Sequence, residues 1–455
     1  MTNPSHTTAT HTSASWRIPS SHPFFHAWKA SAVFGLVGGV ASWVGFSSNP
    51  ERFAFSYLFA FLCFLFIGLG AIFYVLILHL TSAGWAVTTR RTAEFFASGM
   101  PVLALLFLPI VPVMQHLYPW YQHEVQQQEF SLLSASRADA QVPSGHPDPA
   151  HAAPAGHSPK AQEAHHDAAH GPAHAAHEMV VKKKHAYLNK PFFLLRMLLY
   201  FCAWLFLSFR LVSLSVQQDE SRNLANTVKL KRMAAPGIIL LALTLTFASF
   251  DWIMSLEPAW YSTIFGVYLF ASSAVAIFSV VIVTTLALRS RGFFGEAINV
   301  EHYHDLGKLL FGFIVFWAYI AFSQLLLIWY AGIPEEATFY HIRWDGGVWQ
   351  RVSLFLLFGH FFFPFALILS RNIKRRLTIL GFAAGWMLLV HVVEMYWFVM
   401  PNYRVEPFQF HWLDVACLLF VGGVYKAVVL RKMAHHSLIP IGDPRLDRSL
   451  HFENA

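Results

Sequence analysis

Ten stretches of this 455-residue chain are apolar over about twenty residues or more, the length that an α-helix needs to cross a bilayer. A lipid core offers no water to satisfy backbone groups, so each stretch is expected to form a transmembrane helix. The sequence therefore predicts an all-α polytopic membrane protein, a bundle of ten transmembrane helices. The predicted spans are residues 27–47, 54–80, 93–116, 191–215, 233–256, 261–288, 308–331, 349–370, 377–399 and 410–430.

The composition agrees with this class and argues against a soluble domain. Only 13% of the residues are charged and 56% are hydrophobic, whereas soluble domains carry roughly 25% charged residues. The formal charge of +7 comes from arginines and lysines in short loops between apolar runs. That pattern is typical of membrane topology. The partner it indicates is the lipid bilayer, and no nucleic acid is expected.

The basic loops also predict the orientation. Arginines and lysines gather after the second, fourth, sixth, eighth and tenth spans, while the alternate connections carry few. By the positive-inside rule the basic connections are cytoplasmic, as are both termini. The predicted organisation is a cytoplasmic N-terminal tail (1–26), helices 1–3 (27–116), an external loop (117–190), helices 4–10 (191–431) and a cytoplasmic tail (432–455).

The long external loop, residues 117–190, is rich in Ala, Pro, Gly and His. Such a composition cannot bury enough apolar area to fold by itself, so residues 140–180 are expected to be disordered. His-rich tracts can also bind metal. No fixed spacing of ligands favours that alternative here, and no metal site is predicted.

Ionisable groups inside apolar runs are costly and commonly mark proton relays or substrate paths. One such stretch, Ser249 to Phe270, places Asp251 near the end of a hydrophobic run, with Glu257 just beyond it. Depth along the spans sorts the candidates into a cytoplasmic tier and an outer tier, with one histidine near the middle. The proton-path candidates are His79, Glu94, Asp251, Glu257, His360, His391, Glu394 and Asp414.

His391 and Glu394 are spaced i, i+3 and share one helix face, so an imidazole and a carboxylate can exchange a proton there. Together with Asp251 they are predicted to form a relay near the outer face. The alternative is structural: locally paired groups that pin helices together, with Asp251 an interfacial helix-end residue hydrogen-bonded near Trp260 or Tyr261. For His360 taken alone, the structural interpretation is favoured.

Cofactor and catalytic motifs are not found. Cys63, Cys202 and Cys417 have no zinc, iron–sulfur or haem c spacing, and His360 and His391 are the only plausible haem pair. Apart from Gly359 and Gly385, neither span offers the small residues that a porphyrin needs, so no haem or iron–sulfur cluster is expected in this chain. No nucleophile elbow, phosphate loop or dinucleotide fingerprint occurs, and no catalytic residue is assigned.

Four long motifs carry a resemblance to a known family. They are HLTSAGWAVTTRRTAE (79–94), SFDWIMSLEPAWYSTIFGVYLF (249–270), DLGKLLFGFIVFWAYIAFSQLLLIWYAGIPEE (305–336) and HVVEMYWFVMPNY (391–403). These resemble the F subunits of bacterial alternative complex III, a quinol:cytochrome c (or high-potential acceptor) oxidoreductase, within the polysulfide-reductase-type (NrfD-like) membrane proteins. The resemblance covers essentially all ten spans, but not the His-rich loop or the tails.

The resemblance implies a respiratory-chain membrane subunit in the bacterial cytoplasmic membrane. Its expected role is non-catalytic or quinone-binding, with quinone or menaquinone as the possible ligand. Implied partners are a multihaem cytochrome c, an iron–sulfur protein and a second NrfD-like subunit. The two polar tiers would then be half-channels for protons. From the residues alone, a proton-coupled secondary transporter remains the alternative, although no Gly/Pro-interrupted pair of helices occupies corresponding positions.

Overall fold

The structure is a computed structural model that describes the whole chain except residues 1–15, 123–182, 345, 404–407, 409 and 455. The predicted disorder at 140–180 and the possible metal-binding histidines of that loop lie outside the described residues. The part that is described is helical and contains no strand. Among these described residues, ten helices are long and apolar enough to cross a membrane, so the predicted all-α multi-pass fold is confirmed.

Eight of the spans are built on a long helix. They are α1 (Ala27–Ser48), α2 (Pro50–Leu80), α9 (Lys190–Ser221), α10 (Leu224–Trp252), α11 (Phe265–Arg289), α12 (Val300–Ala331), α17 (Leu377–Val399) and α18 (Trp412–His435). Short 3-10 turns precede or follow some of them: η2 (Pro23–His26), η4 (Met254–Leu256) and η6 (Met400–Asn402).

The third and eighth spans are interrupted, and both contain proline. The third comprises α3 (Val87–Ala97), α4 (Met100–Phe107), the 3-10 turn η3 (Leu108–Val113) and α5 (Met114–Leu117). The eighth comprises α14 (Gly347–Leu356), the π-helical turn η5 (Leu357–Phe362) and α15 (Phe363–Ile368). Three short helices lie in connections or the tail: α13 (Pro334–Trp344), α16 (Arg371–Lys374) and α19 (Leu446–Leu450).

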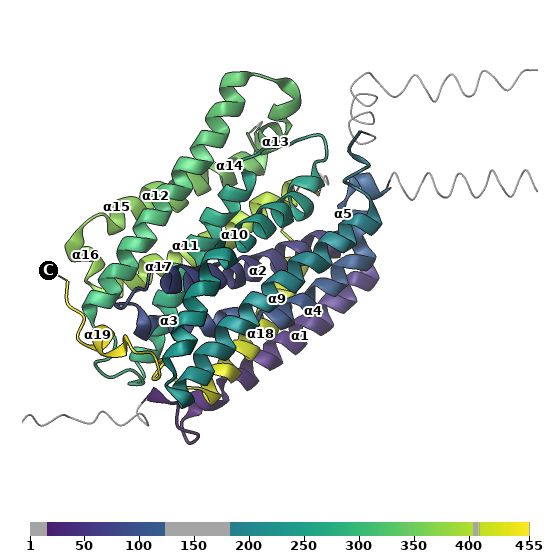
Figure 1. The fold of residues 1–455 in the computed structure, drawn as a ribbon. Coiled ribbons are helices and arrows are strands. Elements are labelled where there is room, and N and C mark those ends of the chain that lie inside the picture. The colour runs from purple at the N-terminus through teal and green to yellow at the C-terminus, as the bar shows by residue number, and fades with distance from the viewer. Residues whose placement is uncertain (1–15, 123–182, 345, 404–407, 409, 455) are drawn as a thin grey trace, which may run out of the picture.

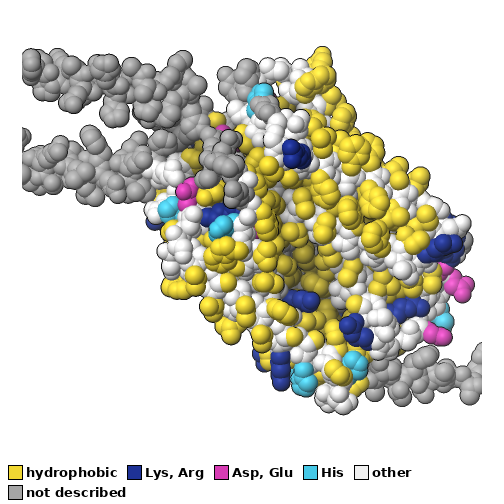
Figure 2. All heavy atoms as spheres, turned by 180° about the vertical axis from the view of Figure 1, so that it is seen from behind, with side chains coloured by type: hydrophobic (Ala, Val, Ile, Leu, Met, Phe, Trp, Pro, Cys, Tyr) yellow, Lys and Arg dark blue, Asp and Glu magenta, His cyan; other side chains and the backbone are white. Residues whose placement is uncertain are grey.

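Helices α2 and α11 form the centre of the bundle and are buried over most of their length. The peripheral helices bury one face and expose leucine, valine and phenylalanine on the other. Figure 1 shows the helices lying side by side, with α12 and the α13–α14 region projecting beyond the rest of the bundle. From behind, Figure 2 shows a largely hydrophobic face that is hollowed in the middle, with most of the Lys and Arg side chains toward its lower and lateral margins.

The two ends of the bundle differ in their connections. We call the end that carries residues 81–86, 222–223, 290–299 and 369–376 the basic end, because the predicted basic loops lie there. The other end, which carries residues 257–264, 332–344 and 400–403, is called the opposite end.

The first and last spans are in close contact through glycine. A Cβ atom built on Gly38 would lie 2.4 Å from the backbone N of Phe420, and one on Gly423 would lie 2.4 Å from the N of Gly35. Only glycine permits backbones to approach this closely, as at small-residue interfaces in membranes. Helix α1 is therefore held mainly by α18 and leaves its other face, which includes Leu36 and Trp43, exposed.

The C-terminal residues 436–454 fold back over the basic end, and we call them the C-terminal strap. The sequence predicted only a cytoplasmic tail from residue 432. In the structure Leu438 N donates to Trp16 O at 2.9 Å, and Ser449 Oγ donates to Trp85 O at 2.6 Å. Asp443, 5% exposed, accepts from Arg90 and Arg445. The strap is thus anchored to the loop and helix that follow α2.

Candidate functional site

Four carboxylates within the described spans are fully buried, each with no exposed surface: Glu94, Asp251, Glu394 and Asp414. A buried ion is costly unless a counter-charge compensates it. The nature of each partner therefore decides whether a carboxylate is fixed in charge or is free to exchange a proton.

Asp251, at the end of α10, is held by an arginine of α9. Arg196 donates to both carboxylate oxygens, Nε at 2.9 Å and Nη2 at 2.8 Å, and Tyr200 Oη donates at 2.7 Å. Arg196 also stacks on Tyr187, 3.8 Å from the ring centroid. This bidentate pair is strong and geometrically specific. None of the observed contacts joins Asp251 to His391 or Glu394, so the structure does not bring the three predicted relay residues together.

Asp414 and Glu94 are also held by arginine. Asp414, in the first turn of α18, accepts from Arg52 at 2.5 Å, Ser56 at 2.6 Å and Tyr396 at 2.9 Å. Glu94, on α3, contacts Arg90 at 2.9 Å and Arg91 at 3.3 Å. Both carboxylates therefore have a partner with a permanent charge, because arginine stays protonated in proteins.

Two further predicted candidates, His79 and Glu257, lie at opposite ends of the bundle. His79 is 1% exposed at the basic end of α2, and neither of its ring nitrogens makes a hydrogen bond to any described residue. Glu257 is 7% exposed at the opposite end, beyond η4. It acts electrostatically on the buried guanidinium of Arg343, whose pKa burial lowers to about 9.

Glu394 differs from the other three because its partners are all neutral or titratable. Trp317 Nε1 on α12 donates to Oε1 at 2.6 Å, and Ser272 Oγ on α11 lies 2.5 Å from Oε2. His360 Nε2, from η5, approaches Oε2 at 3.5 Å. Helix α17 itself adds His391, whose Nδ1 is 3.3 Å from Ser272 Oγ. We call these five residues the Glu394 site.

The π-helical turn explains how His360 reaches this site. Phe363 N–H bonds to Phe358 O, five residues back, so the carbonyl of Gly359 is left out of the helix pattern. Trp386 Nε1 donates to that carbonyl at 2.7 Å. Pro364 follows and has no N–H to restore a regular turn. Such π turns occur frequently at functional sites. Here the turn places the His360 ring against Trp317, stacked at 3.5 Å.

Ser272 connects the two titratable groups. His391 Nε2 lies 3.1 Å from Cys63 O, a carbonyl that can only accept, so Nε2 carries a hydrogen. The other ring nitrogen faces the Ser272 hydroxyl, which also faces Glu394. A hydroxyl is both donor and acceptor. The chain Nδ1–Oγ–Oε2 is therefore continuous for a proton.

The sequence alone does not identify Ser272, Trp317 or the arginines Arg52 and Arg196 as partners. A serine pair at 272–273, in the middle of an apolar span, was the available signal for Ser272. For His360 alone the sequence favoured a structural role. Its ring both stacks on Trp317, as a structural residue would, and approaches the Glu394 carboxylate, as a relay residue would.

No metal site appears among the described residues: no group of three or more His, Cys, Asp or Glu side chains could hold an ion. Comparison with known proteins adds no assignment. No protein-family model matches the chain, and no curated protein is similar enough to be counted as a match.

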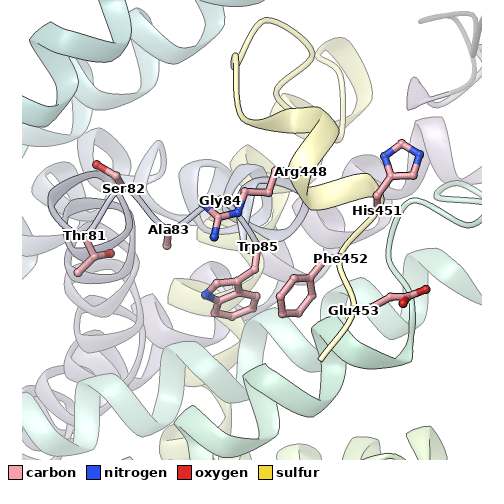
Figure 3. A pocket seen from close by; sticks show the side chains of 9 residues that line it. All are labelled: Thr81, Ser82, Ala83, Gly84, Trp85, Arg448, His451, Phe452 and Glu453. Carbon is pink, nitrogen blue, oxygen red and sulfur yellow. The ribbon is translucent and has the colours of Figure 1, made fainter. Parts of the chain in front are cut away.

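A hollow of about 440 Å³ at the basic end is separate from the Glu394 site. It lies between the loop after α2 and the C-terminal strap, and Figure 3 shows Trp85 and Phe452 facing one another with Arg448 close to Gly84. None of its lining residues contacts Glu394. It is lined by Thr81, Ser82, Ala83, Gly84, Trp85, Arg448, His451, Phe452 and Glu453.

Proposed function

We propose that this protein is the proton-handling membrane subunit of a quinol:high-potential-acceptor oxidoreductase complex in a bacterial cytoplasmic membrane. The observation that carries the proton-handling part is the Glu394 site, a buried carboxylate with no lysine or arginine among its observed partners. The assignment to that complex, with its haem- and iron–sulfur-containing partners and its quinone, is supported by the four sequence motifs. The basic end is taken as cytoplasmic by the positive-inside rule.

The mechanism follows from the hydrogen bonds of Ser272. In the first arrangement, the Glu394 carboxyl is protonated and donates a hydrogen bond to Ser272 Oγ. The Ser272 hydroxyl in turn donates a hydrogen bond to Nδ1 of a neutral His391. In the second, the hydroxyl hydrogen has moved to His391 and the carboxyl hydrogen to Ser272. The hydroxyl now donates to an ionised Glu394, and Nδ1–H donates to Oγ. The net result is the transfer of one proton from Glu394 to His391. No carbon, nitrogen or oxygen atom has to move.

The resting state is the uncharged arrangement. Two opposite charges in a low-dielectric interior cost several kcal/mol of desolvation each, and no fixed cation offsets that cost at Glu394. His360 provides the exit or entry atom. Its Nε2 approaches the carboxylate, and its Nδ1 makes no hydrogen bond to a described residue. A water at Nδ1 would continue the path, and Trp317, stacked on the imidazole, holds the ring in this position.

The experiment compares two adjacent serines. Ser272→Ala removes the hydroxyl that links His391 to Glu394, so proton-coupled quinol oxidation should fall by about 10²-fold, the scale of a lost proton-transfer group. Ser273→Ala is the matched control. Ser273 is also buried on α11, but it donates to the carbonyl of Phe66 at 2.6 Å and lies outside the site. Turnover and proton release would be measured in vesicles with the assembled complex. Equal loss in the two variants would contradict the relay.

A proton-coupled secondary transporter remains the second candidate. The sequence alone indicated no Gly/Pro-interrupted pair of helices in corresponding positions, but spans three and eight are both interrupted helices that contain proline, a feature of transporter binding sites. Affinity purification in mild detergent separates the two functions. A complex subunit should bring down haem c and iron–sulfur proteins, visible by absorbance spectroscopy. A protein that purifies alone, and exchanges protons with a solute in vesicles, would be a transporter.

A further inference from the structure

A second hollow, of about 380 Å³, lies at the basic end where α12 meets the connection between the eighth and ninth spans. Three of its six lining residues are lysine or arginine. It is lined by His304, Lys308, Leu369, Arg371, Lys374 and Asn454. We call it the cationic hollow.

The positive charge of the cationic hollow is only partly neutralised. Lys308 pairs with Asp305 at 2.6 Å, but the Lys374 ammonium donates to the carbonyls of Ile368 and Leu369 at 2.9 and 2.8 Å. Carbonyls accept a hydrogen bond but carry no net charge. Burial, and then the nearby charge of Lys308, lower the pKa of Lys374. Both contributions disfavour the charged form of Lys374, and a bound anion would stabilise that form.

His304 provides an independent indication of a ligand. The residue is 5% exposed, and its Nδ1 makes no hydrogen bond to any described residue. The nearest carboxylate, that of Asp305, is 3.9 Å away and already binds Lys308 and Asn454. A buried polar atom without a partner is uncommon in native structures. An anion in the hollow would supply an acceptor for this ring.

The surface below the hollow is apolar and exposed. An exposed stripe runs along α12 from Lys308, which lines the hollow, and its residues are spaced at helical intervals. Beyond Lys308 it continues through Gly312, Val315 and Tyr319, all of them exposed. A Cβ built on Gly312 would meet no atom within 4 Å, so the stripe has a gap there. Leu369, which lines the hollow, is 55% exposed. A free phosphate would make no use of this stripe, whereas the acyl chain of a lipid would cover it.

We propose that the cationic hollow binds the phosphate headgroup of an anionic phospholipid, with an acyl chain lying along the exposed stripe of α12. Arg371, Lys374 and Lys308 provide the positive charge, and His304 provides a hydrogen-bond donor. Basic pockets at the cytoplasmic ends of transmembrane helices bind lipid headgroups in this manner. This site is independent of the Glu394 site and of the function proposed above.

The test uses the purified protein or complex with phosphatidylglycerol or phosphatidylcholine as the probe, and native mass spectrometry as the readout. The double variant Lys308→Gln/Arg371→Gln removes two charges and should weaken phosphatidylglycerol binding by about fivefold for each cation removed. Lys229→Gln/Lys231→Gln is the control, because both lysines are exposed on α10 at the same end. It should bind phosphatidylglycerol like the wild type.

Further arms separate lipid from free phosphate and folding from binding. Lys308→Arg/Arg371→Lys keeps the charge and should retain the lipid, which shows that a loss in the glutamine variant is electrostatic. Inorganic phosphate at millimolar concentration should not displace the lipid. Three results would each overturn the proposal: no preference for phosphatidylglycerol over phosphatidylcholine, equal binding by the glutamine variant and the wild type, or displacement by phosphate alone.

Discussion

Asp251 and Glu394 are both fully buried carboxylates in the bundle, but their partners differ in kind. Asp251 is bound at both oxygens by Arg196, whose charge is permanent. Glu394 is bound by an indole, a hydroxyl and an imidazole, none of which is permanently charged. The first arrangement fixes the ionised carboxylate and joins α9 to α10. The second leaves a proton that can move. Burial alone therefore does not distinguish a structural carboxylate from a functional one.

The largest expected effect comes from changing each acid to its amide. Asp251→Asn leaves Arg196 without its counter-charge and should cost about 3–5 kcal/mol of stability, the scale for breaking a buried pair. Glu394→Gln leaves no cation unpaired, so the fold should survive while proton-coupled turnover is lost. Yield after detergent extraction and the thermal midpoint report the first effect, and turnover with proton release in vesicles reports the second.

A double substitution sharpens the Asp251 half of this comparison. Asp251→Leu together with Arg196→Met replaces the pair with apolar groups and should recover most of the lost stability, because neither charge remains buried alone. Two results would contradict the contrast between the sites. One is Asp251→Asn and Glu394→Gln variants of equal stability; the other is a Glu394→Gln variant with unaltered proton release.

An intermediate effect, on the pH dependence of stability, is expected at Asp443. This carboxylate of the C-terminal strap is bound by arginine, as Asp251 is. Burial alone would raise the pKa of this carboxyl, but hydrogen bonds from Arg445 and the charge of Arg90 outweigh it and hold the pKa well below its ordinary value. A lowered pKa stabilises the folded form above the unfolded pKa of about 4. That stability, about 2 kcal/mol, is lost as the pH falls through the lower folded value.

Hydrogen exchange of the strap, corrected for the intrinsic rate at each pH, measures this effect. Protection of the backbone near Leu446 should decrease below about pH 4, and Asp443→Asn should lower it already at pH 7. Asp447→Asn is the control, since that side chain is 89% exposed and lies on the same strap. If protection from hydrogen exchange in the wild type did not depend on pH, Asp443 would not anchor the strap.

The smallest effect tests the charge on Glu394. Trp317→Phe keeps a ring against His360 but removes the Nε1–H that donates to Oε1. If the carboxyl rests protonated, the loss is that of a neutral hydrogen bond, about 1 kcal/mol. Trp386→Phe, which loses a hydrogen bond to the Gly359 carbonyl, should cost the same. A larger loss at Trp317, about 2–3 kcal/mol, would indicate an ionised Glu394 and a resting charge pair.

The spans were predictable because lipid imposes one rule on every backbone group that it surrounds. The ninth span was expected at 377–399 and is found as Leu377–Val399. The ends of the other spans lie within about nine residues of the predicted ones, the largest difference being at the start of the fifth span, Leu224–Leu256. The site was only partly predictable. The spacing of His391 and Glu394 fixes their common face, but the residues opposite them come from α11, α12 and η5, which no local pattern relates.

The partners of the carboxylates were the least predictable feature. Asp251 and Arg196 are 55 positions apart, and Asp414 and Arg52 are 362 apart. Depth in the membrane placed each acid at about the right level, but helix neighbours decide which residue it meets. The prediction therefore grouped Asp251 with His391 and Glu394 on depth alone, and the choice of neighbouring helix separates them.

The contact between Gly35 and Gly423 has a consequence for biosynthesis. Helix α1 enters the membrane before α18, the helix that fits its glycine face, which is made about 390 residues later. At about 5–20 residues per second, α1 waits some 20–80 seconds beside lipid or a chaperone before the bundle can close. A nascent chain that ends before α18 therefore leaves the glycine face of α1 uncovered.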